Sequence, residues 1–486
     1  MLQQLTRAAL IAALAVFAPR AHAQTGDTLA LSLHEAVERA LRASDEVRLA
    51  AAQVDVADAQ VVTARATGLP QLRLSSSYTH VYENARGQAV GQIFNQPNTY
   101  NTNANLSQTI FQGGRVLAGW RAASRLRQAS RLSAGEVRAQ VALDVQRAYL
   151  EALFATRMVE IQTANFTLAT TRLTQIEQFQ TAGRAARYDV LRTRVERANL
   201  EPLVIQARTD RQIAMLELKR LLNIPPVQPV SLTTAIDAGA VQAVLASFQA
   251  PDSVGTDTRA SVRAAELTAR ARHDAISVAR ADFLPTISAF LQVGYQAFPL
   301  SGFPTDRGRL DSSFCPPNSA PDRACSNGGW FSDRLIGLTV SWPIFDGLRA
   351  KGNFDLARAQ ARVADIELQL EREAVALEVA QARAELERAR SFYAAQQQNA
   401  QEADEAFSLA SLRYTRGLGT QLEVSDAQLA LLTAQTNEAR ATYDLYLATA
   451  ELARAMGRPM MLPPAPAERA PTRTTSGSAT TPHANP

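Results

Sequence analysis

Alternating apolar and polar positions mark two short parts of the chain. In the first part, Leu72, Leu74 and Tyr78 share one side of an extended segment, and Arg73 and Ser75 share the other. A period of two predicts β-strands. The second part repeats the pattern, with an apolar side made of Ile287, Ala289, Leu291, Val293, Tyr295, Ile336, Leu338, Val340 and Trp342. Apolar faces with aromatic ends indicate strands of a membrane barrel, and an ordinary half-buried sheet is the alternative.

Two long tracts without proline, residues 98–201 and 344–458, are dominated by Ala, Leu, Gln, Glu and Arg. These residues favour helix. The first predicted helix, residues 116–180, would be about 97 Å long at 1.5 Å per residue. Gly183 and Gly417 can end the long helices in the left-handed conformation, so each tract is predicted to fold back as a helical hairpin.

The returning arms of the hairpins are predicted at residues 187–222 and 421–456, about half as long as the first arms. Pro202 is expected to kink the first returning arm. Helices predicted at residues 33–67 and 258–282, ahead of each strand pair, have the right length to stack end to end with the returning arms.

Strand pair and hairpin both occur twice because the sequence is a tandem duplication. Leu69-Pro70 recurs as Leu284-Pro285, and Ile110-Phe111 recurs as Ile344-Phe345. The offset between the copies is 215 at the first match and 234 from the second match onwards. The loop of the second strand pair, residues 296–333, therefore carries an insertion.

The first 23 residues predict a cleaved secretory signal, with Arg7 ahead of an apolar run that ends in small residues. In an exported chain, Cys315 and Cys325 of the long loop could form a disulfide, and two cysteines are too few for a zinc site. The formal charge of +4 shrinks when the signal and its arginines are removed. Charge therefore gives no reason to expect a nucleic-acid partner. No later stretch has about 18 apolar residues, so no transmembrane α-helix is expected.

Four strands per chain are too few to close a barrel, although every backbone N–H and C=O inside a bilayer needs a partner. Two chains would give eight strands with a filled interior, whereas three would give twelve strands with room for a lumen. We therefore predict a homotrimer. The expected fold is mainly α with a small β part: duplicated long antiparallel helical hairpins form an α-barrel tunnel, and four transmembrane β-strands per chain contribute to a 12-stranded β-barrel.

The chain resembles the TolC-like outer-membrane efflux protein family from residue 31 through Gly457. The resemblance rests on the duplication, the Leu-Pro junctions, the Ile-Phe-x-Gly turns and the segment 414–426. It implies a trimeric exit duct in the cell outer membrane with a long periplasmic extension. It also implies docking onto a periplasmic adaptor (membrane fusion) protein and, indirectly, an inner-membrane pump or ABC exporter, in a tripartite efflux or type I secretion system.

On this basis the chain is divided into eight parts. They are a signal peptide (1–23), tunnel helices (24–68), a first strand pair (69–112), a first hairpin (113–225), a linker with a second lead helix (226–283), a second strand pair (284–346), a second hairpin (347–459) and a disordered tail (460–486).

Candidate gate residues follow from the resemblance. Glu423 and Asp426 match the acidic ring at the narrowest point of the family's tunnel, where like-charge crowding raises carboxyl pKa values. Tyr414 and Asp189 match a latch that holds the tunnel closed. The family's arginine after the turn is replaced by Gly419, so the closed-state network must differ. Without the resemblance, these residues are an exposed acidic pair and a packed tyrosine.

The hairpin turns are the candidate contacts for the adaptor, because open-ended tips need a partner. By the resemblance, these contacts are Gly183 in the first copy and Gly417, Leu418, Gly419 and Thr420 in the second. The first copy lacks the matching Leu and Thr. The alternative is that the glycines only end helices.

The main functional hypothesis is that the protein is a passive conduit, and the alternative is that it is a soluble periplasmic coiled-coil adaptor or scaffold. No enzyme activity and no cofactor or metal are expected, because the histidines His34, His80 and His273 are isolated and no Gly-rich phosphate loop occurs. The generic polar lining of the expected tunnel does not identify the cargo.

Overall fold

A computed structural model describes residues 28–83, 85, 97–234, 259–299, 302–304 and 330–457 of the protein. The predicted signal peptide, the predicted tail and the proposed Cys315–Cys325 bridge lie outside these residues.

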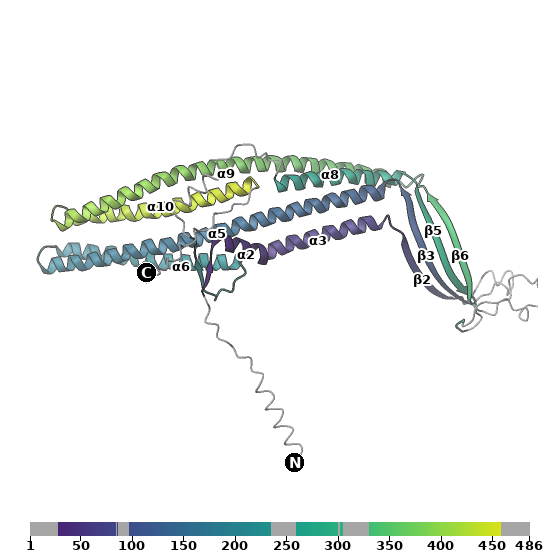
Figure 1. Cartoon of the computed structure of the whole chain (residues 1–486), viewed down its shortest axis with the longest axis horizontal. Helices are drawn as coiled ribbons and strands as arrows, with labels where there is room; N and C mark the ends of the chain where they lie inside the picture. The colour runs from purple at the N-terminus through teal and green to yellow at the C-terminus, as the bar shows by residue number, and fades with distance from the viewer. Residues whose placement is uncertain are drawn as a thin grey trace, which may run out of the picture. The chain divides into compact units, whose positions relative to one another are not determined.

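The two long helices are α5 (Arg115–Thr181) and α9 (Arg349–Thr415), each of 67 residues (Figure 1). The returning helices are α6 (Arg187–Leu221) and α10 (Gln421–Ala455), each of 35 residues. Each bound of α9 and α10 lies 234 residues after the corresponding bound of α5 and α6. The predicted hairpins are thus confirmed to within one or two residues. Pro202 lies inside α6 without ending it.

The lead segment of the first copy differs from the single helix that we expected. It contains α2 (Leu33–Ala43) and α3 (Asp45–Ala66), separated by Ser44 in an extended conformation (φ −63°, ψ 133°). Ser44 Oγ accepts a hydrogen bond from the backbone N–H of Glu46 at 3.2 Å, so Ser44 caps α3. In the second copy, a single helix, α8 (Ala260–Arg280), runs into a 3₁₀ turn at Ala281–Phe283.

The four predicted strands form one antiparallel sheet in the order β2-β3-β5-β6. Their bounds are Gln71–His80, Asn98–Gln112, Thr286–Ala297 and Trp330–Ser341. The pairing of β3 with β5 joins the two copies, and one cross-strand row contains Leu72, Leu106, Leu291 and Ile336. All four of these side chains are exposed, so the sheet presents the predicted apolar face.

A second sheet was not anticipated. Strands β1 (Leu29–Leu31) and β4 (Val230–Leu232) pair in parallel across about 200 residues of sequence. The hydroxyl of Tyr149 on α5 donates to the carbonyl of Leu31 at 2.8 Å and accepts from the N–H of Thr234 at 3.2 Å. This buried tyrosine therefore ties β1 and the residues directly after β4 to the long helix.

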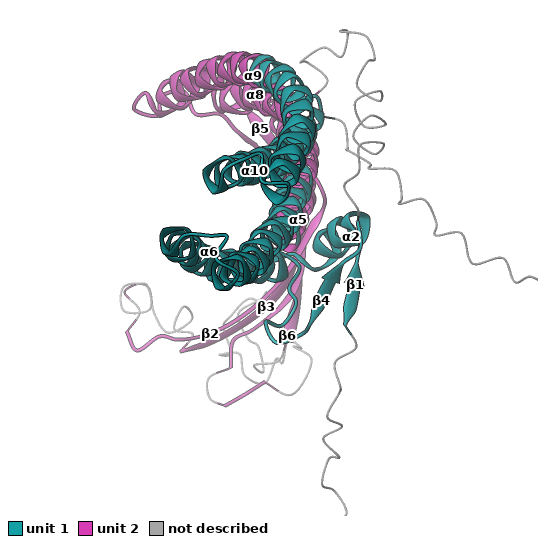
Figure 2. Cartoon of the chain, turned by 90° about the vertical axis from the view of Figure 1, so that its left-hand side faces the viewer, with its two compact units in different colours: residues 1–47, 138–253, 379–486 teal, residues 48–137, 254–378 magenta. Residues whose placement is uncertain are grey.

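The chain forms two compact units, and each contains parts of both copies (Figure 2). Unit 1 is residues 1–47, 138–253 and 379–486, and its core packs α5, α9 and α10 through Leu150, Leu386 and Tyr446. Unit 2 is residues 48–137 and 254–378 and contains the four-stranded sheet.

In unit 2, buried Arg259 at the start of α8 bonds Glu136 of α5 at 2.7 Å and Glu378 of α9. This ion-paired arginine joins three helices of the unit. Among the described helices, none is both long and apolar enough to cross a membrane.

Candidate functional site at the hairpin ends

Both hairpin turns use the same backbone geometry. Gly183 and Gly417 have φ of +71° and +75°, the left-handed region that glycine occupies without strain. The next residue closes each turn: Arg184 N–H donates to Phe179 C=O at 2.7 Å, and Leu418 N–H donates to Arg413 C=O at 2.9 Å. These are Schellman motifs, which explains why helices of 67 residues end here.

Each returning helix begins with a cap whose acidic member is a predicted gate residue. In the second copy, Thr420 Oγ1 accepts from Glu423 N–H at 3.3 Å, and Glu423 Oε1 accepts from Thr420 N–H at 3.4 Å, which is a capping box. In the first copy, Asp189 occupies the position of Glu423 and accepts from Ala186 N–H at 3.2 Å. Ala186 has no side-chain oxygen, so the first cap is incomplete.

The predicted acidic pair is exposed at the start of α10. Besides its capping bonds, Glu423 forms an exposed ion pair with Arg413, with 3.8 Å between Glu423 Oε2 and Arg413 Nη2. An exposed ion pair contributes little stability. Asp426 is exposed one turn further along the helix. Glu423 therefore has a local structural role, and the ring of carboxylates stays a prediction that involves further chains.

The two predicted latch residues lie near each other. Burial raises the pKa of the Tyr414 hydroxyl, and the negative charge of Asp189 raises this pKa further, against the opposing effect of Arg172 and Arg184. The Tyr414 ring also packs against Phe179, with ring centroids 6.4 Å apart. Tyr414 on α9 thus contacts the end of the first hairpin.

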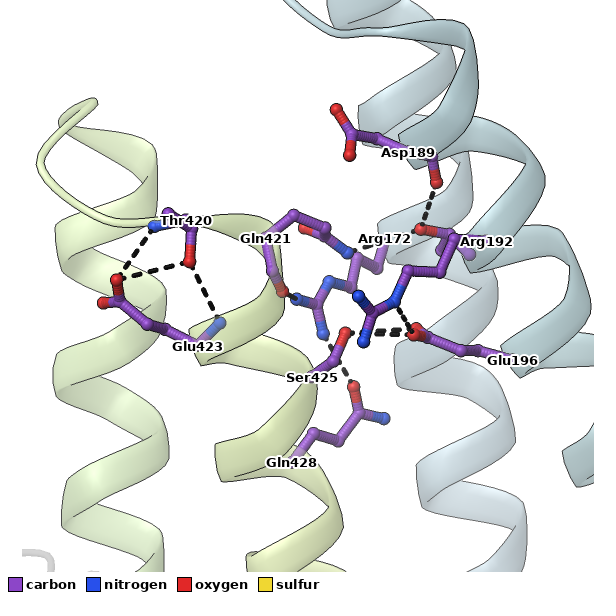
Figure 3. A network of polar contacts seen from close by, with 10 residues as sticks. Arg172, Asp189, Arg192, Glu196, Thr420, Gln421, Glu423, Ser425 and Gln428 are labelled. Atoms are coloured by element: carbon purple, nitrogen blue, oxygen red, sulfur yellow. Dashed lines mark hydrogen bonds and ion pairs between the residues drawn. The ribbon is translucent and has the colours of Figure 1, made fainter.

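Arg172 is the centre of a polar network that the sequence analysis missed (Figure 3). Its side chain is buried on α5, and burial lowers its pKa. Nη1 donates to Gln428 Oε1 at 3.0 Å, and Nη2 donates to the Gln421 carbonyl at 3.1 Å. Both acceptors are neutral and belong to α10, so a buried cation joins the first hairpin to the second.

The network continues onto α6. Gln421 Nε2 donates to Thr193 Oγ1 at 3.3 Å, and Thr193 Oγ1 donates to the Asp189 carbonyl at 2.9 Å. Ser425 Oγ donates to Glu196 at 3.2 Å, and this carboxylate also accepts from Arg192 Nε at 3.0 Å (Figure 3). Helices α5, α6 and α10 are thus connected by hydrogen bonds next to the predicted latch.

The available sequence signal for this network was weak. Arg172 resembles the many exposed arginines of the helical tracts, and only the spacing of Gln421 and Gln428 by seven residues places two amides on one helix face. Sequence alone does not show which helix faces them.

Comparison with known proteins gives the class of this molecule. The family described as outer membrane efflux protein matches residues 36–223 and 256–458. The chain belongs to the outer membrane efflux protein family, whose members act at the outer membrane.

Individual relatives and solved structures are similar over most of the chain. The pyoverdine export outer membrane protein OpmQ of Pseudomonas putida is 26% identical over 446 residues, which cover 87% of this chain and 85% of OpmQ. The solvent efflux pump outer membrane protein SrpC of Pseudomonas putida is 27% identical over 310 residues, covering 62% of this chain and 58% of SrpC. The crystal structure of the outer membrane protein VceC of Vibrio cholerae superposes with a TM-score of 0.70 at 21% identity, covering 88% of this chain and 96% of VceC.

Proposed function

We propose that this protein is the outer-membrane exit duct of a tripartite efflux system and works as a homotrimer. The observation that carries the proposal is the four-stranded sheet, in which β2 and β6 each pair on one side only within the described chain. The apolar face of this sheet is exposed, as for Leu72 and Ile336 at 74% and 84%. In a bilayer such a sheet needs neighbours on both edges, and three copies supply twelve strands around an open lumen.

The chain supplies a path, and the energy for transport comes from its partners. The similarity to OpmQ and SrpC, named for pyoverdine export and solvent efflux, supports small organic molecules as cargo. We infer that a periplasmic adaptor contacts the hairpin turns, where Leu418 is 71% exposed beside Gly417. An inner-membrane pump acts through that adaptor. This role requires no catalytic group in the duct, and Glu423, Asp426, Tyr414 and Asp189 are proposed as its gate.

Cross-linking of the sheet edges tests the trimer. Leu74 on β2 and Leu338 on β6 are exposed on the apolar face, and cysteines at both positions could meet only between neighbouring chains. A flexible bis-maleimide applied to outer membranes is expected to give a ladder that ends at three chains.

Both native cysteines, Cys315 and Cys325, are first replaced by serine, so that only the introduced cysteines react. Each variant with one introduced cysteine is the matched control and should give no species above two chains. A ladder that ends at two chains, or a protein that fractionates with the soluble periplasm, would contradict the duct and favour the adaptor or scaffold alternative.

A further inference from the structure

Two cavities occur at equivalent places in the two copies, both within unit 2. The first has a volume of about 720 Å³ and is lined by residues that include Arg65, Leu69, Ile110, Phe111, Leu117 and Trp120. The second has a volume of about 430 Å³, and its lining includes Phe283, Trp342, Ile344, Phe345, Leu348 and Lys351. Ile110, Phe111 and Leu117 correspond to Ile344, Phe345 and Lys351 at the offset of 234. Duplication has therefore preserved a cavity as well as a fold.

Both cavities lie where the apolar face of the sheet ends and the long helices begin. Phe111 pairs with Ile287, which pairs with Val340, so the three form one of the last rows of that face. Trp342 follows two residues after Val340 and lines the second cavity. The cavities thus continue the membrane-facing surface towards its edge, the level at which tryptophan is enriched in membrane proteins.

The cavity walls are mainly apolar, yet they are open to solvent in the isolated chain. Ile344 and Phe345 are 82% and 81% exposed, and Ile110 is 61% exposed. Exposed apolar side chains gathered at one place favour an apolar occupant. A lipid acyl chain meets this requirement at the edge of a bilayer.

Each cavity also has one basic side chain without a bonded partner among the described residues. These are Arg65 in the first cavity and Lys351 in the second. The carboxylates of the second cavity are engaged elsewhere: Asp282 bonds Arg115 and Asn353, and Asp346 accepts from Ala350 N–H at 2.9 Å. An apolar wall with one available cation matches the acyl chain and the phosphate of a phospholipid.

We propose that the two cavities are specific sites for an anionic phospholipid at the helix-side edge of the membrane. The acyl chain lies against the Ile-Phe wall, and the phosphate pairs with Arg65 or Lys351. The inference rests on the proposed function for the placement of the sheet in the outer membrane. A polypeptide occupant is disfavoured because both cavities continue the lipid-facing apolar surface of the sheet.

The three tryptophans of the chain provide the assay. Trp120 lines the first cavity and Trp342 lines the second, so a Trp330→Phe background with one further Trp→Phe change reports on each cavity separately. The full-length protein is reconstituted into vesicles with brominated phosphatidylglycerol or brominated phosphatidylcholine, and quenching gives relative binding constants. We expect phosphatidylglycerol to bind about fivefold more strongly at both sites, the effect of one basic residue near a membrane surface.

Single substitutions assign the selectivity to each cation. Arg65→Ala should reduce the preference for phosphatidylglycerol over phosphatidylcholine to about onefold at Trp120 and leave it unchanged at Trp342. Lys351→Ala should reduce the preference at Trp342 and leave it unchanged at Trp120. Arg362→Ala, at an exposed position further along α9, is the matched control and should change neither value.

Two results would overturn the proposal. Equal binding of both lipids by the parent protein would mean ordinary bilayer contact, and the absence of quenching by either lipid would mean that protein fills the cavities. Cross-linking of the same variants with Leu74→Cys and Leu338→Cys added separates this failure from that of the proposed function. A trimer without lipid preference rejects only the sites, whereas loss of the trimer rejects the duct.

Discussion

Arg172 shows how much one residue can determine at the hairpin ends. Its buried guanidinium loses hydration and has no direct ion pair among the described residues, so its hydrogen bonds to Gln428 and Gln421 must offset the desolvation. These two hydrogen bonds hold the start of α10 against α5, because both acceptors belong to α10.

Loss of Arg172 should loosen the connection between the hairpins. Arg172→Ala leaves the Gln421 carbonyl and the Gln428 amide without this donor, and we expect a loss of about 1.5–3 kcal/mol of stability, the usual contribution of hydrogen bonds to charged groups. Single-channel conductance should rise, because α10 is released from α5. Planar-bilayer recording and thermal unfolding measure the two effects.

Arg194→Ala is the matched control for Arg172→Ala. Arg194 pairs with Glu177 at 2.9 Å near the same end, but both side chains are about half exposed. An exposed pair contributes roughly 0–1 kcal/mol, so little change is expected. Equal conductance in both variants would remove the Arg172 network from the gate.

The cap at Glu423 changes how the acidic ring should be tested. Alanine at this position would remove both the charge and the capping box, whereas glutamine keeps the cap. Glu423→Gln with Asp426→Asn should therefore lower the cation-to-anion permeability ratio and leave the unfolding temperature nearly unchanged. Reversal potentials in a salt gradient measure this ratio.

Thr420→Ala provides the converse variant. It removes the side-chain cap at a cost of about 1 kcal/mol and keeps both carboxylates, so stability should fall while ion selectivity is retained. If the charge-neutral double variant kept full cation preference, the carboxylates would not form the selective ring.

At the scale of elements, the two hairpin turns depend on backbone conformation. A Cβ added at Gly183 or Gly417 would meet no atom within 4 Å, so a larger residue would have enough space. The constraint at both positions is instead the positive φ. Gly183→Ala and Gly417→Ala should each cost about 1–2 kcal/mol. Gly352→Ala, inside α9 with equal space, should instead stabilise the protein by about 0.5–1 kcal/mol. Chemical denaturation measures the change in the free energy of unfolding for all three variants. A change of the same sign at all three positions would contradict this account.

Sequence predicted most of the elements whose determinants are local. Helix composition and Gly183 or Gly417 set the hairpins, and the alternation of Leu72 and Leu74 set the strand faces. The break at Ser44 was missed although Ser-Asp-Glu is a local capping signal, because the expectation of an uninterrupted lead helix was stronger. The β1–β4 pair and the Arg172 network were missed because their partners are distant in sequence, and pattern alone does not specify which helix faces which.

At the scale of the whole molecule, the edges of the sheet make the fold depend on assembly. Among the strands that the structure describes, β3 and β5 are paired on both sides, whereas β2 and β6 are each paired on one side. Unpaired edges have backbone groups that water or another chain must satisfy.

If neighbouring copies pair β6 with β2, hydrogen exchange of the detergent-solubilised trimer should be equally slow at residues 71–80, 98–112, 286–297 and 330–341. The protein dissociated to single chains should exchange faster at the first and last of these segments, with little change in α6. Rapid exchange at both edge strands within the intact trimer would mean that helices alone hold the chains together, and the shared barrel would have to be abandoned.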